Sequence, residues 1–109
     1  MDFKVLAVGD VVGTPGLNRV SRSLRYLKRK TGADFVIVNG ENASAVGMTP
    51  QQGEEIFDAG ADVITMGNHT WSRREIVPYI EENSRVLRVA EAGYFAGGEG
   101  LGHIRLKLR

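Results

Sequence analysis

Five polar side chains follow closely on three short apolar runs of the chain. The runs are residues 3–8, 35–38 and 63–66, and the side chains that follow them are Asp10, Glu41, Asn42, Asn68 and His69. In open α/β sheets, ligands bind beyond the carboxyl ends of the strands. If each run is a strand of one parallel sheet, these five side chains should converge at one edge of that sheet.

Carboxylate, carboxamide and imidazole groups without a thiolate are typical ligands of divalent iron, manganese or zinc, and Mg²⁺ is the less favoured choice. Asp10 could bind one ion, Glu41 could bridge two, and Asn68 could bind the second. Two ions about 3.5–4 Å apart can hold a phosphoryl group and activate a water molecule. His69 could then protonate the leaving oxygen. The pattern predicts metal-dependent hydrolysis of a phosphoester.

The apolar runs alternate with helical patterns, which predicts an α/β fold with a mostly parallel sheet flanked by helices. Residues 3–8 are rich in valine and do not alternate, so we expect a central strand that is buried on both faces. Residues 35–38 and 63–66 should form the second and third strands, and residues 86–89 are a candidate fourth strand.

The first helix should begin at Pro15, with Thr14 as its N-cap, and should end at Gly32. Apolar residues recur in it at spacings of three and four, which predicts a stripe that packs on the sheet. The stripe consists of Leu17, Val20, Leu24 and Leu27. The basic residues between positions 19 and 30 are most simply the solvated face of this helix, and binding of RNA there is a minor hypothesis.

Two further helices are predicted from their capping signals. Residues 49–52 can form a capping box that opens a helix ending near residue 59. Ser72 and Glu75 offer a second capping box, with Ile76, Tyr79 and Ile80 on the inward face of the helix. Pro78 would interrupt a helix that begins at Ser72, so we expect either a kink or a later start.

Composition limits the class of protein. The chain has 109 residues, a formal net charge of +1 and no cysteine. We expect one domain over residues 1–109, with a glycine-rich tail at 90–109 in which residues 103–109 alternate like an edge strand. The N-terminus has no signal-peptide pattern, and no apolar run approaches the roughly 18 residues of a membrane span. These features favour a cytoplasmic protein without a membrane partner.

Three motifs in the chain resemble the YmdB branch of the calcineurin-like metallophosphoesterases, which are bacterial phosphodiesterases acting on 2′,3′-cyclic nucleotides. The motifs begin at Gly9-Asp10, Asn39-Gly40-Glu41-Asn42 and Met66-Gly67-Asn68-His69, and the resemblance covers roughly residues 3–88. It implies that Asp10 binds the first metal, Glu41 bridges both, and Asn68 binds the second. It also implies that Asn42 supports the site, that His69 acts near the leaving group, and that the substrate is a small phosphoester such as a cyclic nucleotide.

The chain departs from this branch in length, in histidine content and in its divergent glycine-rich tail at 90–109. Members are roughly twice as long, form a sandwich of two sheets, and have further metal-binding histidines in their second half. This chain contains only His69 and His103. Neither ion would have the three protein ligands that are typical of a catalytic site. We therefore expect the first half of a metallophosphoesterase sandwich, as a fragment, a truncation or the product of an altered reading frame.

Two alternatives to an independent enzyme follow from the incomplete ligand set. The chain could be a catalytically incomplete, non-enzymatic module that binds partners or oligomerises, because half of a sandwich should expose an apolar sheet face. A partner chain could also contribute the absent histidines. Self-association is the natural way to cover an exposed sheet face, and we expect a homo-oligomer.

Overall fold

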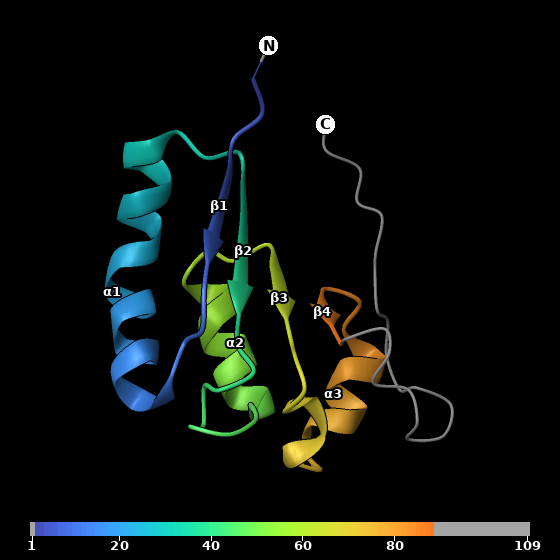
Figure 1. Cartoon of the computed structure of the whole chain (residues 1–109). Coiled ribbons are helices and arrows are strands. Elements are labelled where there is room, and N and C mark those ends of the chain that lie inside the picture. The colour runs from blue at the N-terminus through green and yellow to red at the C-terminus, as the bar shows by residue number, and fades with distance from the viewer. Residues whose placement is uncertain (1, 89–109) are drawn as a thin grey trace.

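The computed structural model describes residues 2–88, and it contains one parallel four-stranded sheet with helices between successive strands (Figure 1). The predicted α/β fold is therefore confirmed. The elements are β1 (Val5–Val8), α1 (Gly13–Thr31), β2 (Phe35–Asn39), α2 (Pro50–Asp58), β3 (Val63–Thr65), the 3₁₀ helix η1 (Thr70–Ser72), α3 (Ile76–Glu82) and β4 (Val86–Leu87).

The strand order β1-β2-β3-β4 follows the chain without a reversal. Because crossovers between parallel strands share one hand, a sheet built in one direction carries its helices on one face. Burial agrees, since Val36, Val38 and Ile64 of that face are fully buried in one cluster with residues from all three helices. The other face of the sheet, which includes Phe35 and Ile37, carries no helix among the described residues.

The expectation that the first strand is central and buried on both faces is wrong. Within residues 2–88, β1 pairs only with β2 and lies at the end of the sheet. Val5, which shares the helix-free face with Phe35, is 51% exposed. An apolar run without alternation indicates burial on two faces, but among residues 2–88 the strand has only one neighbour in the sheet and a helix layer on only one face.

Helix α1 differs from its prediction at two positions. It begins at Gly13 with Val12 as N-cap, so Thr14 is inside the helix and does not cap it. Leu27 is 39% exposed, whereas the other three members of the stripe are buried. At 100° per residue Leu27 lies at the margin of the stripe, beyond the line of contact with the sheet. The predicted stop at Gly32 is confirmed, and this residue adopts a left-handed conformation.

One basic side chain of α1 has a structural role. The Arg25 guanidinium donates a hydrogen bond to the carbonyl of Asp58 at the end of α2. This bond ties the two helices together over the sheet. RNA binding by the basic face stays a prediction, and Arg25 is not a freely available cation for it.

The capping box that was predicted for α2 is confirmed. Thr49 accepts a hydrogen bond from the Gln52 backbone N–H, and the Gln52 side chain accepts one from the Thr49 backbone N–H. The capping box at Ser72 is wrong, because Ser72 belongs to η1 and α3 begins at Ile76. The later start that Pro78 predicted is therefore observed. Pro78 is in the first turn, where a missing N–H leaves no hydrogen bond unmade.

Strand boundaries differ by one or two residues from those predicted, as is usual for element ends. The predicted edge strand at 103–109 and the glycine-rich tail at 90–109 lie outside the described residues. Within residues 2–88, no helix is both long and apolar enough to cross a membrane.

Candidate functional site

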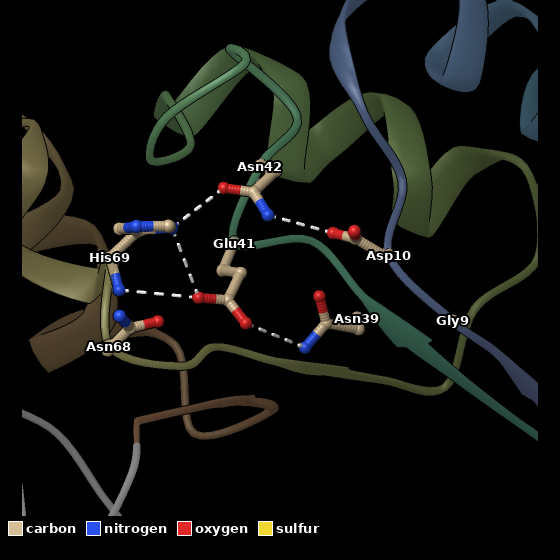
Figure 2. A pocket seen from close by; sticks show the side chains of 7 residues that line it. All are labelled: Gly9, Asp10, Asn39, Glu41, Asn42, Asn68 and His69. Carbon is tan, nitrogen blue, oxygen red and sulfur yellow. Dashed lines mark hydrogen bonds and ion pairs between the residues drawn. The ribbon is translucent and has the colours of Figure 1, made fainter.

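The carboxyl ends of β1, β2 and β3 open into one pocket of about 360 Å³. All five side chains selected from the sequence line this pocket (Figure 2). The complete lining set is Gly9, Asp10, Asn39, Glu41, Asn42, Asn68 and His69. The fold therefore brings the five candidate residues together, and the roles assigned to them stay predictions.

The loop after β1 is fixed to the loop after β2 by backbone hydrogen bonds. The Val11 N–H donates to the Asn39 carbonyl at 3.2 Å, and the Gly13 N–H donates to the Asn42 carbonyl at 2.9 Å. Asp10, which directly precedes Val11, has φ of 27°, which is uncommon for a residue with a side chain. Such conformations persist where the surrounding structure enforces them, and they are concentrated at functional sites. The exposed Asp10 carboxylate is thereby presented at the pocket.

Gly67 and the backbone of His69 set the position of the Glu41 carboxylate. A Cβ atom added at Gly67 would lie 2.2 Å from Glu41 Oε1 and 2.5 Å from Oε2, so only glycine permits this approach. The backbone N–H of His69 donates to Oε2 at 3.3 Å, and Nδ2 of Asn39 donates to Oε1 at 3.5 Å. The Glu41 side chain is 17% exposed. Its carboxylate therefore lies beyond the end of β3, between the backbone of residues 67–69 and the side chain of Asn39.

A chain of hydrogen bonds links Asp10, Asn42 and His69. Asn42 Nδ2 donates to Asp10 Oδ1 at 2.8 Å, and Asn42 Oδ1 lies 2.8 Å from His69 Nδ1. Because the Asp10 carboxylate can only accept, it fixes the amide with its oxygen toward the imidazole. His69 Nδ1 must then be the donor, and Nε2 is left to exchange a proton.

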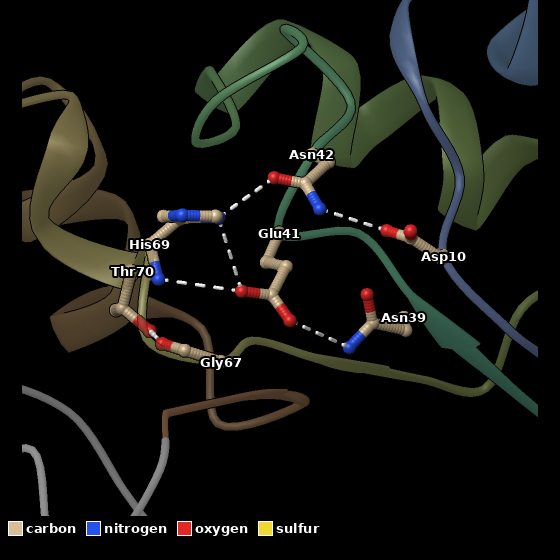
Figure 3. A network of polar contacts seen from close by, with 7 residues as sticks. All are labelled: Asp10, Asn39, Glu41, Asn42, Gly67, His69 and Thr70. Atoms are coloured by element: carbon tan, nitrogen blue, oxygen red, sulfur yellow. Dashed lines mark hydrogen bonds and ion pairs between the residues drawn. The ribbon is translucent and has the colours of Figure 1, made fainter.

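The turn that carries Asn68 and His69 is closed by a buried threonine. The Thr70 hydroxyl donates to the Gly67 carbonyl at 2.5 Å, and the Thr70 backbone N–H donates to the same oxygen at 3.1 Å (Figure 3). Thr70 is fully buried. Both bonds hold the turn in which Gly67 approaches Glu41 and His69 faces Asn42.

The donors of the pocket fit a hard divalent cation in kind. Asp10 and Glu41 supply carboxylate oxygens, and Asn68 supplies an exposed carboxamide. In number they are few, since residues 2–88 hold no group of three or more His, Cys, Asp or Glu placed to bind one ion. The described chain thus offers a partial coordination set whose carboxylates are already oriented.

Asn39, Gly67 and Thr70 contribute to this site and were not assigned functional roles from the sequence. Asn39 could have been found from the sequence, because it is the last residue of β2, the strand after which Glu41 and Asn42 come. Gly67 lies inside a recognised motif, but its steric role depends on a side chain 26 positions earlier. No local pattern in the sequence indicates that contact.

Comparison with known proteins places this chain in a family. The family model described as "YmdB-like protein" matches residues 6–109, a range that includes the glycine-rich segment. The chain is 38% identical over 104 residues to the 2′,3′-cyclic-nucleotide 2′-phosphodiesterase of Bacillus subtilis (strain 168). This match covers 94% of the chain and 39% of the relative.

Two solved structures have the same fold. A hypothetical protein from Thermus thermophilus superposes with a TM-score of 0.81 at 34% identity, covering 94% of this chain and 39% of that one. A structure described as a novel phosphatase from Mycoplasma pneumoniae superposes with a TM-score of 0.86 at 31% identity, covering 98% and 39%. The chain therefore spans about two fifths of the length of these relatives, and it belongs to the YmdB-like protein family.

Proposed function

We propose that this chain carries part of a metal-dependent phosphodiesterase site, which acts on small phosphoesters such as 2′,3′-cyclic nucleotides. The observation that supports this function is the convergence of two carboxylates, two carboxamides and one imidazole on a single pocket. Family membership supports it as well, because a relative is described as a 2′,3′-cyclic-nucleotide 2′-phosphodiesterase. In this proposal Asp10 holds one divalent ion, Glu41 bridges two, and Asn68 holds the second.

Two bound divalent ions would supply charge neutralisation at the phosphoryl group and an activated water molecule. The chain's own residues supply orientation and proton transfer. Asn42 holds the His69 ring through Nδ1, which leaves Nε2 as the ring atom that would give a proton to the leaving oxygen. His69 Nδ1 also lies 3.5 Å from Glu41 Oε2.

Metal content and turnover, measured together, test this function. Protein purified without chelator is analysed for iron, manganese and zinc, and hydrolysis of 2′,3′-cyclic AMP is followed with and without added Mn²⁺. We expect metal in the purified chain and a Mn²⁺-dependent rate that Asp10→Ala abolishes. Hydrolysis that survives both chelation and Asp10→Ala would overturn the mechanism.

A second candidate function is self-association without catalysis, and the helix-free sheet face favours it. Phe3 and Val5 are each about half exposed at its β1 end. Exposed apolar side chains on a sheet face that no helix covers are candidates for an interaction surface. Light scattering after size exclusion tests the proposal, and a monomer at all concentrations would contradict it. A dimer that alone binds metal would indicate that a partner chain completes the coordination set.

A further inference from the structure

The Asn39 side chain has two unusual features: one long hydrogen bond and one buried oxygen without a donor. Its Nδ2 donates to Glu41 Oε1 at 3.5 Å, which is a long hydrogen bond. Its Oδ1 is buried, and no hydrogen-bond donor among residues 2–88 reaches it. Figure 3 shows the amide beside the Glu41 carboxylate, on the side away from His69.

The orientation of this amide follows from the charge beside it. If the amide were turned over, Oδ1 would face a carboxylate oxygen and the two acceptors would repel each other. Nδ2 must therefore face Glu41, and Oδ1 must lie where it has no donor. Oδ1 therefore lacks a donor because the amide is oriented so that Nδ2 donates to the Glu41 carboxylate.

Stability does not explain an asparagine at this position. A buried oxygen without a donor destabilises the folded chain, and a hydrogen bond of 3.5 Å returns little. Asn39 shares its sheet face with Phe35 and Ile37, as alternation along β2 requires. An apolar side chain of similar volume would continue that face without an unsatisfied oxygen.

We propose that Asn39 is a positioning residue of the candidate metal site, and that its side-chain amide fixes the Glu41 carboxylate through the oxygen that His69 does not contact. This inference rests on the proposed function, in which Glu41 bridges two ions. His69 holds Oε2 and Asn39 holds Oε1, so both oxygens are oriented before a cation arrives. Partners of this kind, which contact a ligand but not the metal, set the affinity of metal sites.

Opposite effects on metal affinity and on stability distinguish this role from a structural one. Asn39→Leu removes both the donor and the unsatisfied oxygen. Its Mn²⁺ dissociation constant, measured by isothermal titration calorimetry, should rise about 10–100-fold. Its melting temperature in metal-free buffer should stay equal or rise. Thr65→Val is the matched control, because Thr65 pairs with Asn39 in the sheet, and it should leave the dissociation constant unchanged.

An unchanged dissociation constant in Asn39→Leu would overturn the proposal, and so would a melting temperature that falls together with the affinity. If Asn39→Leu does not fold, Asn39→Ala replaces it in the same comparison. A measurement without metal separates this proposal from the proposed function. Glu41→Ala should shift the side-chain amide resonance of Asn39 in a ¹H–¹⁵N spectrum, while that of Asn18 on α1 stays in place.

An Asn39 resonance that does not respond to Glu41→Ala would overturn the contact between the Asn39 amide and the Glu41 carboxylate. If the unchanged chain binds no Mn²⁺ but the resonance does respond, the proposed function of this chain fails while this contact is supported. The two failures therefore have different signatures.

Discussion

Gly67 and Gly53 each permit a close contact, the first at the pocket and the second between two helices. Gly67 leaves room for the carboxylate of Glu41, and an added Cβ would lie 2.2 Å from Oε1. Gly53 in α2 leaves room for the ring of Tyr79 in α3, and an added Cβ would lie 2.8 Å from Cε2. Both positions forbid a side chain in the present arrangement.

The two positions differ in whether the neighbouring side chain can move away from an added methyl group. Glu41 ends in a flexible carboxylate beside an open pocket, so it can turn out at little cost to the fold. Tyr79 is a rigid ring that packs against the core cluster, and its hydroxyl donates to Glu54 at 2.6 Å. The same steric conflict should therefore damage metal binding at Gly67 and stability at Gly53.

The largest effect is expected from Glu41→Ala, which removes the group that the Gly67 contact positions. The Mn²⁺ dissociation constant should rise more than about 100-fold, beyond the range for residues that only contact a ligand. Titration calorimetry measures this. Glu54→Ala removes the other carboxylate of the comparison, and it should leave Mn²⁺ binding unchanged. Equal losses in both variants would mean that overall charge and not the pocket binds the cation.

Gly67→Ala should reproduce much of that effect while every ligand remains present. The added methyl group displaces the carboxylate, so we expect Mn²⁺ affinity to fall about 10–100-fold with little change in melting temperature. A double-mutant cycle with Glu41→Ala checks the cause. Gly67→Ala should have no further effect on Mn²⁺ affinity once Glu41 is alanine, and an additive loss would contradict the steric explanation.

Gly53→Ala should show the reverse pattern. Alanine favours the helix by about 1 kcal/mol over glycine, but overpacking against a ring that cannot retreat costs about 1–3 kcal/mol. We expect a net decrease in the free energy of unfolding, measured by urea denaturation, and an unchanged Mn²⁺ dissociation constant. A stabilised variant would show that α3 can shift away from α2.

The comparison also shows what the sequence could predict. The three strand ends and the capping box of α2 follow from local patterns, because each depends on residues close in the chain. The convergence of the five polar residues follows from the rule that ligands bind beyond the carboxyl ends of the strands in an open α/β sheet. The edge position of β1 could not be inferred, since strand order depends on pairing between distant segments.

The roles of Gly67 and Asn39 were missed for a related reason. Gly67 matters through a carboxylate 26 positions away, and Asn39 matters through an oxygen left without a donor. Glycine and asparagine are both common at strand ends and in turns, so their type alone does not distinguish a turn from a site. Only the contacts in the folded structure distinguish a turn residue from a site residue.

The smallest effect is expected from Tyr79→Phe, which keeps the ring at Gly53 and removes its hydroxyl. Burial, followed by the hydrogen bond to Glu54, raises the pKa of Tyr79 above its ordinary value of 10.0. The folded state therefore retains this proton more strongly than the unfolded state, so the contribution to stability is complete below about pH 10 and declines as pH rises further. Tyr79 is partly exposed, and solvent limits the loss in Tyr79→Phe to about 1 kcal/mol or less near neutral pH. Urea denaturation near pH 7 and near pH 11 should show the difference between the two proteins shrinking at the higher pH. A constant difference would mean that the hydroxyl acts through packing alone, which would leave the close contact at Gly53 as the main link between α2 and α3.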